Sequence, residues 1–407
     1  MLVLADPPPA APRDLCTDCG LSRLPNAKDC GTACQFIRPD YPSLEARVHG
    51  RAAGASGDEH FFGVHLAMHR AALREPAPGA QWTGIATRLA QRALETGAVD
   101  AVLTVVPAAE DRWRPVPALI TDPAEMARAR GMRMGYAPVL ALLAPAAEAG
   151  HRRIAVVGIP CQVHALRKIE ARLGFESVTV IGTPCSDNTT TARFHEFLAR
   201  LDPAPETISY LEFRPDYRVE IRHDDGRVRT VPFLKLPLAD LPRDFFPLTC
   251  RTCVDYSNRL ADVTVGYMAG TGAQWVIVRN ARGRALVDAL GAEIALEEPG
   301  SGGRRAGAVA GFVANTRRAA GGLPLRRMPG WARGIVAWLQ PRLGPKGLEF
   351  ARARIEMKAA ESVLHLRRER PARVKWMVPR HVWRQAAPYG IAPAPPERPV
   401  SEAPPSG

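Results

Sequence analysis

The chain has no apolar run long enough to cross a bilayer, and aromatic residues make up only 6% of its 407 residues. Its most apolar stretch, residues 136–147, is interrupted by Pro138 and Pro145. A membrane-spanning helix needs about 18 or more consecutive apolar residues, so we expect no transmembrane segment. The N-terminus also lacks the basic segment and apolar core of a secretion signal.

Cysteine is too sparse for a disulfide-stapled secreted domain, since the whole chain contains eight. We therefore expect a reducing, cytoplasmic location. The cysteines fall into two sets of four, a local set with the spacing Cys-x2-Cys-x10-Cys-x3-Cys and a dispersed set. The first set is Cys16, Cys19, Cys30 and Cys34, and the second set is Cys161, Cys185, Cys250 and Cys253.

Two sets of four thiolates are the ligands that two 4Fe-4S clusters need, so electron transfer is the leading interpretation. Zinc is the alternative for the first set taken alone, because closely spaced cysteine pairs also suit a tetrahedral structural site. The second set favours clusters, since small zinc modules do not usually lie at strand ends in what looks like a catalytic domain.

The charge balance is strongly basic, with a formal net charge of +13. Such a charge suits nucleic acid, an anionic membrane surface or an acidic protein partner. Much of the arginine excess follows residue 300, so a solvated, Arg-rich tail is the alternative explanation. A basic zinc protein that binds nucleic acid is thus a remote alternative, and we expect no nucleic-acid partner.

Composition divides the chain into four segments. Residues 1–50 are predicted to form a Cys-rich iron–sulfur cap and residues 51–300 a catalytic α/β domain. Residues 301–391 form a C-terminal helical region, and the Pro-rich residues 392–407 are predicted to be disordered. The fold class is α/β, a partly parallel sheet flanked by helices, with an antiparallel extension and the N-terminal cap.

A repeated unit supports the parallel part of this sheet. Apolar strands at residues 154–157 and 178–181 each run into Gly-x-Pro-Cys and then a helix, and the two units lie 24 residues apart. This pattern predicts a parallel crossover. It places Cys161 and Cys185 beyond the carboxyl ends of adjacent strands, where open α/β sheets bind ligands.

Other periodic segments fill in the remaining elements. Residues 85–97 read as an amphipathic helix, followed by a buried strand at 99–106. Residues 218–222 and 227–231 flank Asp224-Asp225-Gly226 as a hairpin. Further strands are expected at 263–265 and 275–278, and a helix at about 347–368.

Two polar turns that enter helices are candidate phosphate or flavin-ribityl sites, because helix N-termini expose free N–H groups. An ordinary helix cap is the alternative for the first turn. The candidate residues are Gln81, Trp82, Thr83, Gly84 and Thr87 in the first turn and Asn188, Thr189, Thr190 and Thr191 in the second.

The sequence resembles the ferredoxin-dependent divinyl chlorophyllide a 8-vinyl-reductases, within the coenzyme F-420 hydrogenase/dehydrogenase β-subunit superfamily. The resemblance covers residues 16–377. It is carried by the motifs Cys16-Thr17-Asp18-Cys19-Gly20, Ala80-Gln81-Trp82-Thr83-Gly84, Asp111-Arg112-Trp113, Cys161-Gln162, Gly182-Thr183-Pro184-Cys185, Asp187-Asn188, Cys250-x2-Cys253, Asp255-Tyr256, Val265-Gly266-Tyr267-Met268, Gln274-Trp275 and Gly344-Pro345-Lys346-Gly347-Leu348-Glu349-Phe350.

The resemblance implies an FAD enzyme with two 4Fe-4S clusters. Such an enzyme takes electrons from reduced ferredoxin and reduces the 8-vinyl group of a magnesium divinyl tetrapyrrole to ethyl, in chlorophyll or bacteriochlorophyll biosynthesis. The superfamily also contains a 7-hydroxymethyl chlorophyll reductase and subunits that reduce a deazaflavin, so membership implies the cofactors better than the substrate. We also expect a homo-oligomer and peripheral association with a photosynthetic membrane.

Residue roles follow from this chemistry. Reduction of a vinyl group needs a proton as well as hydride, and a positioned acid would help. Asp255 and Tyr256, beside the last cysteine pair, are the predicted catalytic residues, although Tyr256 could instead be a packed aromatic. Arg133 and Arg279 are candidates for binding the propionate of the macrocycle.

Overall fold

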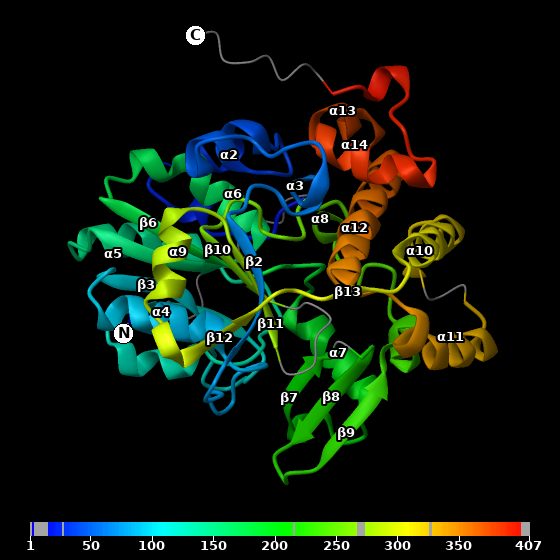
Figure 1. The fold of residues 1–407 in the computed structure, drawn as a ribbon, viewed down its shortest axis with the longest axis horizontal. Coiled ribbons are helices and arrows are strands. Elements are labelled where there is room, and N and C mark those ends of the chain that lie inside the picture. The colour runs from blue at the N-terminus through cyan, green and yellow to red at the C-terminus, as the bar shows by residue number, and fades with distance from the viewer. Residues whose placement is uncertain are drawn as a thin grey trace.

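The computed structural model describes residues 2–3, 15–26, 28–214, 216–266, 273–324 and 328–399. Within these ranges a nine-stranded mixed sheet crosses the molecule in the order β1-β4-β3-β5-β6-β10-β11-β2-β12 (Figure 1). The strands are β1 (Leu2–Val3), β2 (Ala67–Leu73), β3 (Ala101–Pro107), β4 (Pro115–Ile120), β5 (Arg153–Gly158), β6 (Ser177–Gly182), β10 (Val263–Gly266), β11 (Gln274–Val278) and β12 (Ile294–Glu297).

The centre of the sheet is parallel and its two edges are antiparallel. Strands β3, β5, β6 and β10 pair in parallel, whereas β1, β4, β11, β2 and β12 pair antiparallel with their neighbours. The predicted crossover is confirmed, because β5 and β6 are adjacent and parallel with Gly158 opposite Gly182. The two Gly-x-Pro-Cys motifs therefore leave the sheet side by side.

Side-chain alternation along the strands builds two cores, one on each face of the sheet. Val102 and Ala155 face the core formed by α4 (Ile85–Glu95) and α9 (Ala281–Asp288). Leu103 and Val156 face the opposite core, which contains α6 (Pro160–Ile169) and residues of the N-terminal segment. The sheet is thus covered by helices on both faces, as predicted.

The predicted hairpin is confirmed, but it lies outside the main sheet. Strands β7 (Ile208–Phe213), β8 (Arg218–His223) and β9 (Val228–Pro232) form a separate three-stranded antiparallel sheet, which projects at the bottom of Figure 1. Its inner face packs on α7 (Thr191–Leu201) through Phe194, Ile208 and Leu211. The sheet therefore extends from the helix that follows the second Gly-x-Pro-Cys motif.

The remaining helices cover the N-terminal and C-terminal parts of the molecule. They are α1 (Lys28–Ala33), α2 (Tyr41–His49), α3 (Gly57–Phe62), α5 (Leu143–Glu148), α8 (Leu248–Arg251), α10 (Arg305–Ala319), α11 (Gly330–Leu343), α12 (Leu348–Glu369), α13 (Val374–Met377) and α14 (Arg380–Ala386). The helix predicted at 347–368 is α12. A short pair of strands, β13 (Ser301–Gly302) and β14 (Lys346–Gly347), joins the two ends of the segment that holds α10 and α11.

The two ends of the described chain share one core. Phe36 and Tyr41 from the N-terminal segment are buried in the same cluster as Val382 and Trp383. Part of the predicted disordered tail is also ordered, since residues 392–399 include a short 3-10 helix at Pro395–Glu397, and Glu397 pairs with Arg367. Residues 400–407 lie outside the described residues, and the four-segment division stays a prediction.

No helix in the described part of the chain combines the length and apolar character that crossing a membrane requires.

Candidate redox site

The second cysteine set meets at the carboxyl ends of β5 and β6. Cys161 lies in the first turn of α6, and Cys185 follows β6 by three residues. The backbone here leaves no room for a side chain at Gly182, because an added Cβ would lie 2.7 Å from the amide of Asn258. Nδ2 of Asn258 donates to the carbonyls of Gly158 and Thr183, at 2.8 and 3.2 Å. One asparagine thus joins both strand ends.

Cys250 and Cys253 complete this set from α8 and the loop that follows. All four cysteines of this set line one small cavity. The other lining residues are Thr17, Phe36, Tyr136, Ile159, Pro160, Ser186, Asp187 and Asn188. Burial is the main cause of the high pKa values of these thiols. Neighbouring thiols and carboxylates raise the values further, whereas Lys358 lowers those of Cys185, Cys250 and Cys253. The pKa of Cys250 is raised to about 11, and those of Cys161 and Cys185 lie well above their ordinary value.

Polar groups surround these sulfurs. The backbone N–H of Asn188 donates to Cys250 Sγ at 3.4 Å, Nε2 of Gln35 donates to Cys253 Sγ at 3.3 Å, and the Thr17 hydroxyl lies 3.6 Å from Cys161 Sγ. Hydrogen bonds to cluster sulfurs are one means by which proteins set cluster potentials. Gln35 and Thr17 belong to the N-terminal segment, so that segment contacts the second set directly.

The first cysteine set is gathered within residues 16–34. Burial raises the pKa of Cys19 to about 12 and that of Cys34 to about 11, and the other cysteines of the set add to both shifts. Asp18 N donates to Cys16 Sγ at 3.3 Å, and Leu140 N donates to the Cys19 carbonyl at 3.0 Å. The set is therefore anchored to the segment before α5.

The donor chemistry of both sets fits iron–sulfur clusters. Among the residues that the structure describes, no group of three or more His, Cys, Asp or Glu side chains could hold a single metal ion. The second set lines a cavity, with hydrogen-bond donors beside the sulfurs of Cys161, Cys250 and Cys253. Ligation of two 4Fe-4S clusters stays a prediction.

A buried ion network that the sequence analysis missed borders the second set. Nζ of Lys358 lies 2.7 Å from Asp187 Oδ1 and 3.1 Å from Glu361 Oε2. Burial lowers the pKa of Lys358, but the two carboxylates outweigh burial and hold the pKa above its ordinary value. The lysine is thus a charged group beside four thiols. In the sequence it is one of several charged residues in a long helix, so no local signal identifies it.

The first predicted flavin turn is held by structural hydrogen bonds. The Thr83 hydroxyl accepts from Leu73 N at 3.0 Å, and Gln81 Nε2 donates to the Leu211 carbonyl at 3.2 Å. Trp82 has φ 55° and Gly84 has φ 93°, so the turn is left-handed at two positions. The first backbone N–H of α4, that of Ile85, is already occupied, because it donates to Gln274 Oε1 at 3.2 Å. Thr87 lies two residues further along α4 and is half-buried.

The second predicted flavin turn joins the second cysteine set to the loop at residues 130–136. Asn188 Nδ2 donates to the Gly135 carbonyl at 2.7 Å, and the Thr191 hydroxyl donates to the Met134 carbonyl at 2.9 Å. Thr190 caps α7 by accepting from Arg193 N, and Thr189 donates to the Phe245 carbonyl. On the other side of the loop, Arg130 Nη1 lies 3.4 Å from the Pro78 carbonyl. The second turn and the segment just before the first turn thus both contact this loop.

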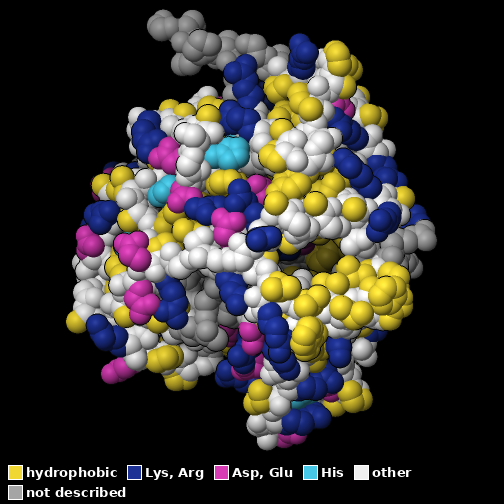
Figure 2. Space-filling model, turned by 45° about the vertical axis from the view of Figure 1, so that its right-hand side comes forward, with side chains coloured by type: hydrophobic (Ala, Val, Ile, Leu, Met, Phe, Trp, Pro, Cys, Tyr) yellow, Lys and Arg dark blue, Asp and Glu magenta, His cyan; other side chains and the backbone are white. Residues whose placement is uncertain are grey.

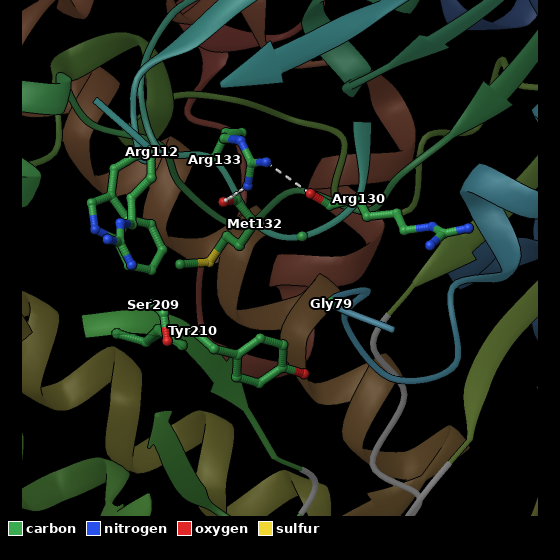
Figure 3. A pocket seen from close by; sticks show the side chains of 10 residues that line it. Gly79, Arg112, Arg130, Met132, Arg133, Ser209 and Tyr210 are labelled. Carbon is green, nitrogen blue, oxygen red and sulfur yellow. Dashed lines mark hydrogen bonds between the residues drawn. The ribbon is translucent and has the colours of Figure 1, made fainter. Parts of the chain in front are cut away.

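A larger cavity of about 260 Å³ lies against this loop (Figure 3). Met132 and Tyr210 face one another across it, while the Arg130 side chain points away. The Arg133 guanidinium donates to the carbonyls of Met132 and Arg130, at 2.7 and 2.8 Å. Burial lowers the pKa of Arg133. The cavity is lined by Gly79, Arg112, Trp113, Arg130, Gly131, Met132, Arg133, Ser209, Tyr210 and Leu211.

The two predicted catalytic residues are buried behind the second cysteine set. Burial raises the pKa of both Asp255 and Tyr256. Asp255 Oδ2 accepts from Arg259 N at 3.0 Å, while its Oδ1 has no partner among the described residues. Tyr256 lies in the same apolar cluster as Trp275, and its carbonyl accepts from Cys185 N at 3.0 Å. Neither residue lines the two cavities described above.

The structure separates the two predicted propionate ligands. Arg133 lines the larger cavity, but Arg279 is fully buried, and its guanidinium donates to the carbonyls of Phe62, Val64 and Ser257. Those bonds occupy the donors of Arg279, so the idea that it binds propionate is wrong. Its strand-end position in the sequence did not show that it would point into the core.

Comparison with known proteins places the chain among redox proteins. An uncharacterized protein of Nostoc sp. strain PCC 7120 is 35% identical over 381 residues, which are 93% of this chain and 94% of that protein. The chloroplastic 7-hydroxymethyl chlorophyll a reductase of Oryza sativa subsp. japonica is 36% identical over 371 residues, 88% of this chain and 78% of that protein.

The fold is shared with a chain of the F420-reducing NiFe hydrogenase complex from Methanosarcina barkeri, at a TM-score of 0.53 and 22% identity, over 58% of this chain and 84% of that one. Residues 68–144 match the family model for the N-terminal part of the coenzyme F420 hydrogenase/dehydrogenase β subunit, and residues 151–300 match the model for its C-terminal part. The chain therefore belongs to the coenzyme F420 hydrogenase/dehydrogenase β-subunit family.

Proposed function

We propose that the protein is a ferredoxin-dependent oxidoreductase that reduces the 8-vinyl group of divinyl chlorophyllide a, or of its protochlorophyllide form, to ethyl. The observation that carries the proposal is the second cysteine set, gathered at the ligand-binding edge of a parallel sheet in a chain 36% identical to a chlorophyll reductase. The proposed cofactors are FAD and two 4Fe-4S clusters.

The reaction adds two electrons and two protons to the vinyl group, and two reduced ferredoxins are oxidised. When bound, the clusters and FAD would collect single electrons and deliver them as a pair. The first cysteine set would hold one cluster, and the second cysteine set would hold the other. The contact between Thr17 and Cys161 supports a short path between the two sets.

Arg133 is the proposed ligand for the substrate carboxylate. Its guanidinium lies at the larger cavity, where its hydrogen bonds go to neutral carbonyls and its Nε has no partner among the described residues. A carboxylate would supply the missing negative charge, and arginine forms its strongest hydrogen bonds with such groups. Asp255 stays the proposed proton donor, because its buried Oδ1 has no partner among the described residues. Since Asp255 lines neither cavity, its proton would have to reach the substrate through an intermediate group.

A second candidate is reduction of a 7-hydroxymethyl chlorophyll, which the similarity to the rice enzyme favours. That reaction also consumes two electrons and two protons, but it releases water as the hydroxymethyl group becomes methyl. A third candidate is electron exchange with a deazaflavin coenzyme, as the family description suggests. All three would use the same donor set.

Anaerobic turnover with reduced ferredoxin separates the candidates. Divinyl chlorophyllide a, 7-hydroxymethyl chlorophyll a and coenzyme F420 are offered separately, and products are identified by chromatography and mass. Conversion of vinyl to ethyl supports the proposal, whereas turnover of another substrate alone replaces it. Arg133→Met should raise KM for the carboxylate-bearing substrate. Arg128→Met, at an exposed arginine that lines neither cavity, is the matched control.

A further inference from the structure

Helix α11 carries a row of large apolar side chains that nothing in the described structure covers. Trp331 is 74% exposed, Ile335 53% and Trp338 61%, and α11 has no buried residue. These residues follow the i, i+4, i+7 spacing that places them on one helical face. Figure 2 shows a broad patch of hydrophobic side chains beside a hollow on this side of the molecule. Such patches mark interaction sites.

The helix is firmly attached although its outer face is bare. Its C-terminal end leads into Pro345, whose carbonyl accepts from the Tyr217 hydroxyl, and then into β14, which pairs with β13. The helix also contacts the short turn at Phe233–Lys235. The body of the protein therefore holds α11 in place and presents its apolar face outward.

The charge around α11 indicates what covers this face. Residues 299–348 contain no Asp or Glu, but they contain eight Arg and one Lys. Arg342 stacks on Trp338, with its guanidinium carbon 4.4 Å from the ring centroid, so a cation lies at the edge of the apolar face. A segment that combines tryptophans with cations and contains no acidic residue of its own complements a bilayer with anionic headgroups.

We propose that α11 docks the protein on the surface of a membrane that contains anionic lipid. Trp331, Ile335 and Trp338 enter the boundary between headgroups and acyl chains, and the arginines of the helix, Arg333 and Arg342, contact lipid phosphates. The helix has 14 residues, which at about 1.5 Å per residue is too short to span the bilayer, so it lies in the plane of the surface. If two copies of the chain met through this face, the cations around α11 in the two copies would repel each other.

Vesicle flotation tests the proposal with the full-length, cofactor-loaded protein. We expect it to float with phosphatidylcholine vesicles that contain about 30% phosphatidylglycerol, to float less with pure phosphatidylcholine, and to be released by salt. The double variant W331S/W338S should lower the partition coefficient at least about tenfold. Trp376→Ser is the matched control, since Trp376 is 43% exposed on α13 and should leave partitioning unchanged.

Three outcomes would overturn the proposal. The native protein could fail to bind either vesicle, or the double variant could bind as well as the native protein. Loss of dimerisation or of ferredoxin affinity in W331S/W338S, without any vesicle binding, would assign the face to a protein partner. Circular dichroism and cofactor content confirm that each variant is folded. Because flotation needs no turnover, this result is independent of the proposed reaction.

Discussion

Nζ of Lys358 lies 2.7 Å from Oδ1 of Asp187, in an ion pair that borders the cavity of the second cysteine set. Both partners come from outside the cysteine motifs, and the lysine is only 5% exposed. A cation held in this position stabilises negative charge on the four thiolates and on any cluster that they bind.

Lys358→Met should therefore make the second cluster harder to reduce. Removing one nearby positive charge should lower its reduction potential by roughly 50 mV, about 1 kcal/mol for one electron. A spectroelectrochemical titration monitored by EPR measures both clusters in the same sample, so the first cluster is an internal control. Lys235→Met, at an exposed lysine, should shift neither potential. Equal shifts of both clusters would contradict the assignment.

The two cysteine sets should bind separate clusters. Anaerobically purified native protein should contain about eight iron and eight sulfide per chain. Cys16→Ala and Cys161→Ala should each lose about half of the iron, and they should remove different EPR signals. Loss of the same signal in both variants would show that ligands are shared between the sets. Four iron atoms together with zinc would remove the two-cluster interpretation.

Glu212 should make stability depend on pH. Burial raises its pKa to about 7, although Trp82 N donates to its carboxylate at 3.3 Å. The folded state therefore holds a proton that the unfolded state has lost, and stability falls as pH rises from about 4.5 to about 7. Glu212→Gln should raise the free energy of unfolding by about 1–2 kcal/mol above pH 7 and change it little near pH 4.5.

Chemical denaturation at several pH values checks this expectation. Glu206→Gln, at an exposed glutamate nearby, is the control and should follow the native curve. If native protein and Glu212→Gln gave parallel curves, ionisation of Glu212 would not be the cause of the pH dependence.

The rate of turnover with ferredoxin should fall steeply as the salt concentration rises. Plant-type ferredoxins are acidic, and a chain with a net charge of +13 would steer them electrostatically. Raising ionic strength from about 0.05 to 0.3 M should lower the initial rate several-fold. The rate with dithionite should change much less, because a small donor has no extended acidic surface. Equal salt slopes for the two donors would remove electrostatic docking from the mechanism.

The sequence pattern predicted the elements whose identity depends on neighbouring residues in the chain. Each Gly-x-Pro-Cys unit follows an apolar strand and enters a helix, so β5, α6 and β6 could be placed from periodicity alone. Strand β2 could not, because it pairs with β11 about 200 residues further along the chain. Its partly exposed side chains also lack the continuous apolar run of a central strand.

The candidate site was predictable only where its residues are chemically distinctive. Cysteine has few roles in a reducing compartment, so the sets stood out. Lys358, Gln35 and Asn258 act through contacts between distant segments, and their residue types are common on protein surfaces. The apolar face of α11 was not predicted, because the sequence alone does not show whether large apolar side chains are covered by other elements.

The position of α12 has a consequence for how the protein is assembled in the cell. Arg354 and Ser362 on this helix contact Ser186 and the Cys253 carbonyl, so α12 closes one side of the second cysteine set. The ribosome makes this helix more than 90 residues after Cys253. A cluster bound by the second set would therefore enter through a side that is open while the nascent chain emerges. Once α12 has docked, release of that cluster would require the helix to move away.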